Sequence, residues 1–433
     1  AAMDTWLNQT FDEGKYKESR LRELGMGKNK AVIRDKLIKQ LVNDRPVRIP
    51  TSPAVRVGVE KELCPNLVAL GDKVSFANDF SLYLTYRHRK SSIAGGDIDD
   101  MDFDEEAPNT GFLSMYREID GRVATPAIEI GASTNRYRHI GVCNIARASS
   151  IYGKEMRSLF GCGEGMVQLG FDFSSLEARI QGHYILPFNG DDLAEQLLAS
   201  KPNDIHSLNA KKLGIPRDQA KSVSYALMYG AAYQKLKKML GLTDEQAKAL
   251  FDAYWDAVEP LKNLRDAVGS SWEARGKSFV IGVDGRKIVT RSKHSLLNAL
   301  FQSGGVICAK YATVFIYQLL EEQGYKCNPF KEKTIDMCGM IEYHDECQLA
   351  VNPKLVQYKI FKTEDELKEF ESTWDGEQLG SAVDGKNGTL VVALPNPVSK
   401  AITKAIDMAV EEVKLKVPLG CEWVVHKNWY GCH

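Results

Sequence analysis

The chain has 433 residues, of which 44% are apolar and 26% charged, as in ordinary globular proteins with two or three subdomains. The formal net charge of −1 excludes an overall basic nucleic-acid coat, and nine cysteines without CxxC spacing exclude a zinc ribbon or a disulfide framework. The N-terminus lacks a signal-peptide pattern, and Lys310 interrupts the longest apolar run, 305–320. We therefore expect a cytoplasmic protein without membrane association.

Helices and strands are expected in an irregular mixture along the chain. In order, the expected elements are a linker around the prolines at 46–53, short strands and turns over 109–133, a strand over 166–173, mostly helices over 190–275, a hairpin over 279–290, a long amphipathic helix over about 294–322, a strand after 345 and a helix over about 397–415. The hairpin is indicated by an Asp-Gly turn between two strand-like runs. Because no regular βαβ alternation occurs, the pattern predicts an α+β fold.

Local charge is uneven near the N-terminus. Between Lys15 and Arg48, eleven basic residues stand against four acidic ones, whereas residues 97–106 are strongly acidic. Runs of this kind are usually solvated faces or loops. The basic segment is also a candidate contact for the phosphates of a nucleic-acid duplex.

The segment 216–230, PRDQAKSVSYALMYG, predicts one helix of about four turns. Its proline suits the first helical position, and its glycine suits the position just past the end. Four residues at four-residue spacing form a slowly winding stripe of roughly 18 Å along this helix: Arg217, Lys221, Tyr225 and Tyr229.

Along the stripe, two cations are followed by two aromatic residues, which matches the order of phosphates, sugar and base in a nucleoside triphosphate. The two cations would hold phosphates, whereas Tyr225 and Tyr229 would meet the sugar and the base. His206, shortly upstream, is a further candidate phosphate donor. From spacing alone, the commoner explanation is an amphipathic helix with extended cations and half-buried tyrosines, and a single histidine is more often a packed or capping residue.

Two carboxylates at strand ends are candidates for metal binding. Asp172 lies at the end of the strand expected over 166–173, and Asp345 precedes an alternating apolar run, with Glu346 beside it. A lone aspartate after a strand is usually a helix cap or a turn residue. As a pair on either side of a triphosphate-binding helix, they fit a two-Mg²⁺ arrangement for in-line attack at phosphorus, in which Mn²⁺ can substitute.

Three segments resemble, in the same order, the signatures of the DNA polymerase I family (family A DNA polymerases), most closely its bacteriophage replicative branch. DFSSLEAR (172–179) is similar to motif A, RDQAKSVSYALMYG (217–230) to motif B and HDE (344–346) to motif C. Supporting matches extend the resemblance over about the last 300 residues: TNRYRH, NIARASSIYGKEMRSLF, DGRKIVTRSKHSLLNALFQSGG and NWYGCH. The resemblance implies a right-hand polymerase architecture with an antiparallel-sheet palm, helical fingers and a helical thumb.

The resemblance also implies a division of the chain. The expected parts are an N-terminal extension with the thumb over 1–133, the first part of the palm over 134–189, the fingers over 190–290 and the second part of the palm over 291–433, with an insertion at about 353–392. Proofreading relatives carry an exonuclease domain ahead of the thumb, and the residues before 134 are too few for both. We therefore expect no 3′–5′ proofreading in this chain. A separate exonuclease subunit and other replisome proteins are candidate partners.

Roles in catalysis and sugar selection carry over by resemblance. Asp172 and Asp345 match the pair that binds two Mg²⁺ ions, and Glu346 is a secondary catalytic carboxylate. Glu177 matches the steric gate that crowds a ribose 2′-OH. Tyr225 stands where the family has Phe or Tyr, and Tyr there is associated with weak discrimination against 3′-deoxy sugars.

Roles in nucleotide and DNA binding follow in the same way. Lys221 matches the residue that protonates or neutralises the leaving pyrophosphate, and Arg217 and His206 match other phosphate contacts. Tyr229 and Gly230 match the end of the fingers helix beside the templating base. Seven further residues are expected to contact DNA: Arg147, Arg157, Arg179, His294, Asn298, Gln302 and His344. Of these, His294, Asn298 and Gln302 lie on the expected long helix and would read the minor groove without sequence preference.

The implied function is template-directed DNA synthesis from dNTPs on primer-template DNA, as in phage replication in a bacterial host. A single-subunit RNA polymerase shares the two aspartates, but Glu177 and Glu346 argue against it. A catalytically idle, polymerase-like DNA-binding scaffold is a second alternative. The intact Asp172, Lys221 and Asp345 argue against that scaffold, because it would not need them.

Overall fold

The computed structural model describes residues 56–57, 62–63, 75–95, 111–139, 141–142, 145–199, 205–228 and 230–432. The chain divides into two compact units, Ala1–Ser114 and Met115–His433. The expected linker, the basic segment 15–48 and the acidic stretch 97–106 lie outside the described residues.

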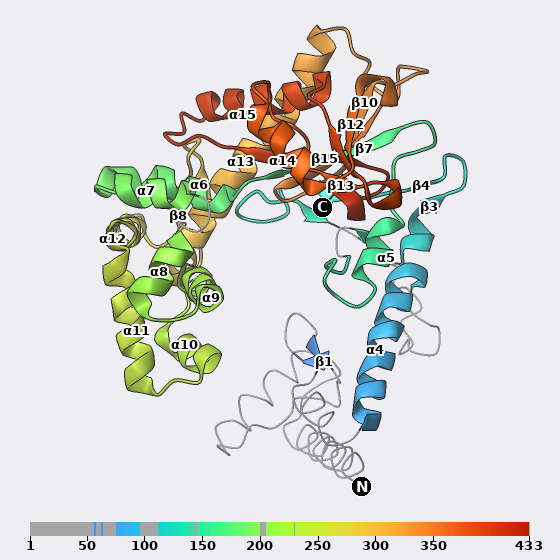
Figure 1. The fold of residues 1–433 in the computed structure, drawn as a ribbon. Helices are drawn as coiled ribbons and strands as arrows, with labels where there is room; N and C mark the ends of the chain where they lie inside the picture. The colour runs from blue at the N-terminus through green and yellow to red at the C-terminus, as the bar shows by residue number, and fades with distance from the viewer. Residues whose placement is uncertain are drawn as a thin grey trace. The chain divides into compact units, whose positions relative to one another are not determined.

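The main described element of the first unit is helix α4 (Ser75–Ala94), drawn in blue in Figure 1. Two short strands, β1 (Arg56–Val57) and β2 (Glu62–Leu63), pair antiparallel. Tyr83 and Tyr86 are exposed on α4, and Ala77 is buried. The helix therefore presents aromatic side chains to solvent.

A four-stranded antiparallel sheet lies at the centre of the second unit (Figure 1). Its strands, in spatial order, are β10 (Met337–Tyr343), β11 (Glu346–Val351), β7 (Val167–Phe173) and β15 (Cys421–His426). The strand predicted over 166–173 is confirmed as β7. Leu169 and Phe171 are buried, because alternate residues of β7 point into the core.

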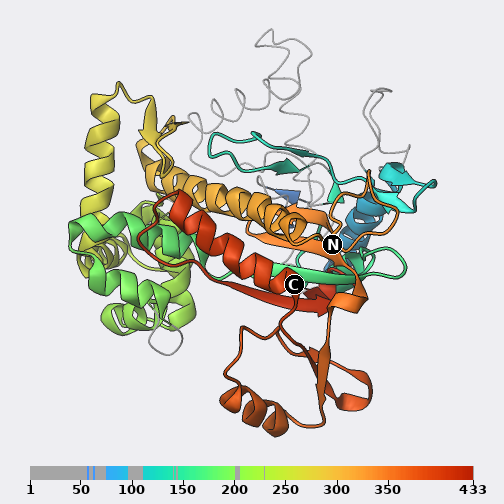
Figure 2. The ribbon, with the colours of Figure 1, turned by 90° about the horizontal axis from the view of Figure 1, so that it is seen from above.

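Three helices share one buried apolar core with this sheet: α6 (Leu176–Ile185), α13 (Leu296–Glu322) and α15 (Pro397–Glu412). The long helices α13 and α15 lie side by side, as Figure 2 shows in orange and red. Within the described part of the chain, α13 with the turn before it is the one segment long and apolar enough to cross a membrane. Its most apolar window is 61% buried inside the protein, as is usual for a core helix.

The region predicted to be mostly helical forms a lobe of short helices (Figure 1). They are α7 (Asp191–Leu198), α8 (Ile205–Leu213), α9 (Arg217–Met228), α10 (Tyr233–Leu240), α11 (Asp244–Ala257) and α12 (Glu259–Ala274). A capping box starts α11, because the Thr243 hydroxyl accepts from the Gln246 N–H and the Gln246 side chain accepts from the Thr243 N–H. The predicted hairpin is confirmed as β8 (Phe279–Ile281) and β9 (Lys287–Val289), with Gly285 at φ 80° in its turn.

Short elements complete the second unit. They are β3 (Tyr116–Arg117), β4 (Arg122–Val123), β5 (Ala127–Ile128), β6 (Arg138–His139), α5 (Gly153–Ser158) and the 3-10 turns η5 (Lys293–Ser295) and η8 (Tyr430–Cys432). The first three strands confirm the prediction of short strands and turns over 109–133.

The stretch at about 353–392 folds into a small subdomain of its own. Its three-stranded sheet has the order β12 (Tyr358–Phe361), β14 (Leu390–Ala393) and β13 (Val383–Asp384), and helix α14 (Glu364–Thr373) follows β12. A separate apolar cluster of Phe361, Leu367 and Val392 forms its core. Figure 2 shows this subdomain beside the main sheet, between β11 and α15 in the chain.

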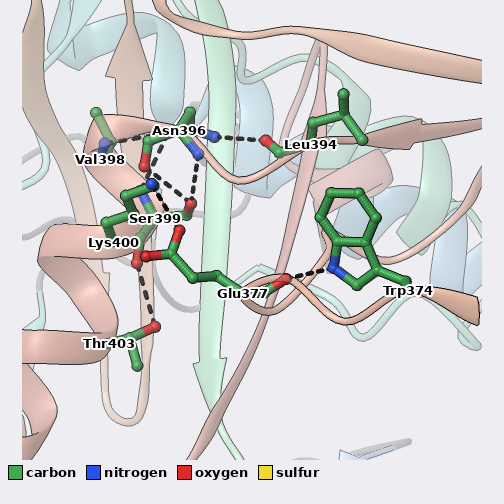
Figure 3. Close-up of polar contacts among 8 residues, drawn as sticks. All are labelled: Trp374, Glu377, Leu394, Asn396, Val398, Ser399, Lys400 and Thr403. Atoms are coloured by element: carbon green, nitrogen blue, oxygen red, sulfur yellow. Dashed lines mark hydrogen bonds and ion pairs between the residues drawn. The ribbon is translucent and has the colours of Figure 1, made fainter. Parts of the chain in front are cut away.

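The subdomain is fastened to strand β15 and helix α15. The Ser381 N–H donates to the Trp423 carbonyl at 2.8 Å, and the Gln378 side chain donates to the Cys421 carbonyl at 2.8 Å. Glu377 pairs with Lys400 of α15 at 2.7 Å, next to the Asn396 cap of that helix (Figure 3). Because β15 is an edge strand, these bonds satisfy backbone groups that would otherwise be open to another strand.

Candidate active site

Two aspartates lie at the same end of the central sheet. Strands β7 and β11 are neighbours, with Asp172 directly opposite Glu346, and the Phe173 N–H donates to the Asp345 carbonyl at 3.0 Å. His344 and Asp345 form the two-residue turn between β10 and β11, and His344 has a left-handed φ of 63°. Asp172 is exposed and Asp345 half-buried. The sheet register therefore brings together two carboxylates that are far apart in sequence.

The donor set at this end of the sheet suits a hard cation such as Mg²⁺, which prefers carboxylate oxygens. Across residues 111–432, apart from the few undescribed positions, no three His, Cys, Asp or Glu side chains form a complete metal cage. Mg²⁺ is usually held by one or two carboxylates together with substrate phosphates and waters, so the incomplete protein shell fits it. Glu422 of β15 is a further exposed carboxylate, opposite Asp172 on its other side.

One residue of the polar stripe on helix α9, Tyr225, lies near Asp345 and Glu177. The pKa of Tyr225 is raised by burial first, and then by the nearby carboxylates of Glu177 and Asp345. Lys221 is exposed one turn earlier, and the Arg217 side chain is 28% exposed and donates to the Ser207 hydroxyl at 3.2 Å. Tyr225 is therefore close enough to the Asp345 carboxylate to be affected by its charge, whereas the expected roles of Lys221 and Arg217 stay predictions.

The end of α9 has the predicted glycine, although Pro216 lies just before the helix instead of at its first position. Gly230 has φ 82°, and a Cβ at this position would lie 2.0 Å from the carbonyl oxygen of His294. Only glycine fits this approach. Tyr229 and the side chain of His206 lie outside the described residues, so their expected contacts stay predictions.

Glu177 forms an ion pair with Arg136, an arginine outside the three motifs. Its Oε1 accepts from the Arg136 guanidinium at 2.9 Å, with side chains 18% and 26% exposed. The pair joins the first turn of α6 to a segment 41 residues earlier. The only signal in the sequence is that Arg136 belongs to TNRYRH, one of the supporting matches.

The expected minor-groove residues lie at the start of α13, with one difference. Asn298 and Gln302 are half-buried on the helix. His294 precedes it in η5, because the Ser292 hydroxyl accepts from the His294 N–H and the α-helix begins only at Leu296. His294 and the expected DNA contact Arg147 are both exposed.

Two expected DNA contacts are occupied with protein groups. Arg157 is only 3% exposed, because its guanidinium stacks on Trp429 at 4.7 Å and donates to the Ala146 carbonyl at 3.2 Å. The prediction of a DNA contact for Arg157 is corrected on this ground. Arg179 donates to the backbone carbonyls of Ser174 and Pro418, and burial lowers its pKa.

His344 is packed among aromatic rings. Its ring lies 4.6 Å from Tyr343 and 5.7 Å from His139, between ring centroids. Burial lowers its pKa, as do the neighbouring Arg136 and His139 to a smaller extent. A neutral imidazole with a left-handed backbone therefore forms the turn that carries Asp345.

The family model for DNA polymerase family A matches residues 108–372. The chain belongs to DNA polymerase family A. Its relatives include the DNA-directed DNA polymerases of Enterobacteria phage T3, at 30% identity over 60% of this chain and 39% of that protein, and of Escherichia phage T7, at 28% identity over 58% and 38%. DNA polymerase I of Caldicellulosiruptor bescii is 26% identical over 54% of this chain and 28% of that protein.

The family A chain spans about two fifths of the length of these phage relatives. A solved structure of the POL domain of Pol1 from M. smegmatis, in complex with DNA primer-template and dNTP, has a similar fold. Its TM-score is 0.58, with 17% identity over 99% of this chain and 65% of that one. The predicted α+β fold with right-hand polymerase architecture is thereby confirmed. The expected assignment of the central sheet to the palm and of the helical lobe around α9 to the fingers stays a prediction.

Proposed function

We propose that this chain is a template-directed DNA polymerase that adds dNTPs to a primer 3′-OH. The observation that carries the proposal is the meeting of three motifs: Asp172 at the end of β7 lies beside the β10–β11 turn that carries Asp345, and Tyr225 of α9 is close enough to Asp345 for its pKa to be affected. The phage relatives are DNA-directed DNA polymerases, and the solved POL domain holds primer-template and dNTP, which supports the same substrates here.

Asp172 and Asp345 would hold two Mg²⁺ ions, or Mn²⁺ in their place, which when bound activate the primer hydroxyl and neutralise phosphate charge. The primer 3′-OH gives up its proton to water as its oxygen forms a bond to the α-phosphorus, and the bond between the α-phosphorus and the oxygen that bridges to the β-phosphate breaks to release pyrophosphate. Lys221 and Arg217 bind the phosphates, and Lys221 donates a proton to the leaving group or neutralises it. The new chain end keeps its 3′-OH for the next addition.

Sugar selection belongs to Glu177 and Tyr225. The Glu177 side chain occupies the space that a ribose 2′-OH would need, and Arg136 keeps it in place at 2.9 Å. The Tyr225 hydroxyl is close enough to the same carboxylate for its pKa to be affected. Both groups therefore border one site, which we assign to the sugar of the incoming nucleotide.

Primer extension tests this proposal directly. With primer-template, Mg²⁺ and all four dNTPs, the chain should extend the primer, and with rNTPs it should extend it at least about a hundredfold more slowly. Matched and mismatched primers on the same gel also reveal any primer degradation. Efficient synthesis from rNTPs would identify an RNA polymerase instead, and primer binding without extension would identify a scaffold.

Tyr225→Phe should raise discrimination against dideoxynucleotides by about tenfold, because one hydrogen bond that substitutes for the missing 3′-OH is lost. The measurement is the ratio of kcat/KM for ddNTP and dNTP in single-nucleotide incorporation. Tyr233→Phe, on the neighbouring helix α10, is the matched control and should leave the ratio unchanged. An unchanged ratio for Tyr225→Phe would remove this residue from the sugar site.

A further inference from the structure

Glu346 follows Asp345 in the chain, but protein groups enclose its side chain. It is 4% exposed, and its Oε1 accepts from the Trp429 indole N–H at 2.5 Å and from the Gln348 amide at 2.7 Å. Asp172, which lies opposite Glu346 in the sheet, is exposed. Adjacent strands therefore carry one carboxylate directed to solvent and one bound to protein donors.

Trp429 belongs to a C-terminal turn that docks on the polar face of the central sheet. Its side chain is fully buried, and its backbone N–H donates to the Phe160 carbonyl at 2.8 Å. The Cys432 carbonyl accepts from the Gln348 amide at 3.3 Å. A Cβ at Gly170 would lie 2.5 Å from that carbonyl oxygen, so the turn lies directly against β7.

Further hydrogen bonds connect β7 with β11 and with the C-terminal turn. The Gln168 amide donates to the Gln348 side-chain oxygen at 2.6 Å, and the Cys432 thiol donates to the Gln168 carbonyl at 3.3 Å. Arg157 stacks on the Trp429 ring at 4.7 Å. These hydrogen bonds connect β7, β11 and the C-terminal turn, and they favour one relative placement of the three, because a shift would leave further buried polar groups without partners.

We propose that Glu346 and Trp429 are positioning residues, whose hydrogen bond sets the placement of the Asp172 and Asp345 carboxylates. Glu346 is the chain neighbour of Asp345 and the cross-strand partner of Asp172, so a shift of its backbone moves both. A displacement of about 1 Å at a reacting centre can cost about a hundredfold in rate. The inference rests on the proposed polymerase function.

A direct metal-binding role for Glu346 makes the opposite predictions. A ligand needs its negative charge, whereas a positioning residue needs only an oxygen that accepts from the indole. Glu346→Gln removes the charge and keeps an amide oxygen at the same place. Glu346→Ala and Trp429→Phe each remove one end of the hydrogen bond.

The test compares these three variants in single-nucleotide incorporation, with kcat, the KM for dNTP and the Mg²⁺ dependence measured separately. Mn²⁺ binding to the protein with primer-template is measured by electron paramagnetic resonance, independently of turnover. We expect Glu346→Gln to stay within about threefold of wild type, and the other two to lose about tenfold or more in kcat. KM, Mg²⁺ half-saturation and Mn²⁺ affinity should change by less than about twofold. The double variant Glu346→Ala/Trp429→Phe should lose no more kcat than the less active of the two single variants, because both remove the same hydrogen bond.

Trp423→Phe is the control for shrinking a buried tryptophan in the same sheet. Trp423 is 1% exposed, and its indole nitrogen makes no hydrogen bond to the described residues. The Trp423→Phe variant should have a melting temperature lowered about as much as that of Trp429→Phe, but its kcat should be unchanged.

Three outcomes overturn the inference. They are a kcat loss of about a hundredfold in Glu346→Gln with weaker Mn²⁺ binding, a normal kcat in Trp429→Phe, and additive losses in the double variant. An Asp345→Asn variant in the same assay separates the two proposals. If that variant polymerises normally, the proposed catalytic site fails, whatever Glu346 does.

Discussion

Asp345→Asn should lower kcat for nucleotide incorporation by about a thousandfold or more, and Asp172→Asn should do the same. Asparagine keeps the shape of the side chain but lacks the negative charge that a divalent cation requires. Both residues stand at the same end of the central sheet, and because both charges would be needed to hold the ions, the loss of either should be severe. Rapid-quench single-turnover extension of a labelled primer measures the effect.

Primer-template affinity should remain within a few fold of wild type in both variants, as fluorescence anisotropy would report. Asp384→Asn is a matched control, because Asp384 is an exposed aspartate in strand β13 of the small subdomain at about 353–392. It should extend primers normally. If Asp345→Asn also does so, Asp345 is not part of the catalytic site.

Glu177→Ala should raise the relative use of ribonucleotides by about a hundredfold, because it opens the space that a 2′-OH would occupy. The measurement is kcat/KM for each rNTP divided by that for the matching dNTP. Glu195→Ala, at an exposed position of α7, is the matched control and should leave this ratio unchanged. An unchanged ratio in Glu177→Ala would show that another group selects the sugar.

Arg136→Ala should give a smaller increase than Glu177→Ala, because the carboxylate remains but loses its ion pair of 2.9 Å. The double variant should select no less well than Glu177→Ala alone, since Arg136 acts on selectivity through Glu177. If Arg136→Ala changes the ratio equally in both backgrounds, the arginine acts on the substrate independently.

Elements with strong local patterns could be predicted from the sequence. Strand β7, hairpin β8–β9 and the helices over 191–274 follow from apolar periodicity, an Asp-Gly turn and caps, which depend on neighbouring residues only. The long helix expected over about 294–322 is confirmed as α13, although the Ser292 cap forms a 3-10 turn first and the α-helix begins at Leu296. Such differences of about two residues depend on cap geometry that composition does not show.

The environment of charged residues was much harder to predict. Arg157 and Arg179 are expected on DNA because of the family resemblance. In the structure, Arg157 is buried against Trp429, and Arg179 donates to the backbone carbonyls of Ser174 and Pro418. Trp429 and Pro418 are distant in sequence, so local sequence carries no signal of these contacts, which became visible only in the folded chain.

By itself, the sequence determined the motifs, their order and the residue types of the candidate site, because these are local patterns with specific spacing. Only the tertiary structure decided which of these residues meet. The register that sets Asp172 opposite Glu346 and Glu422, and the bond from Glu346 to Trp429 83 residues later, arise from strand pairing between distant segments. Such pairing is selected by the packing of the whole sheet, where a shift of one residue would turn every side chain to the opposite face.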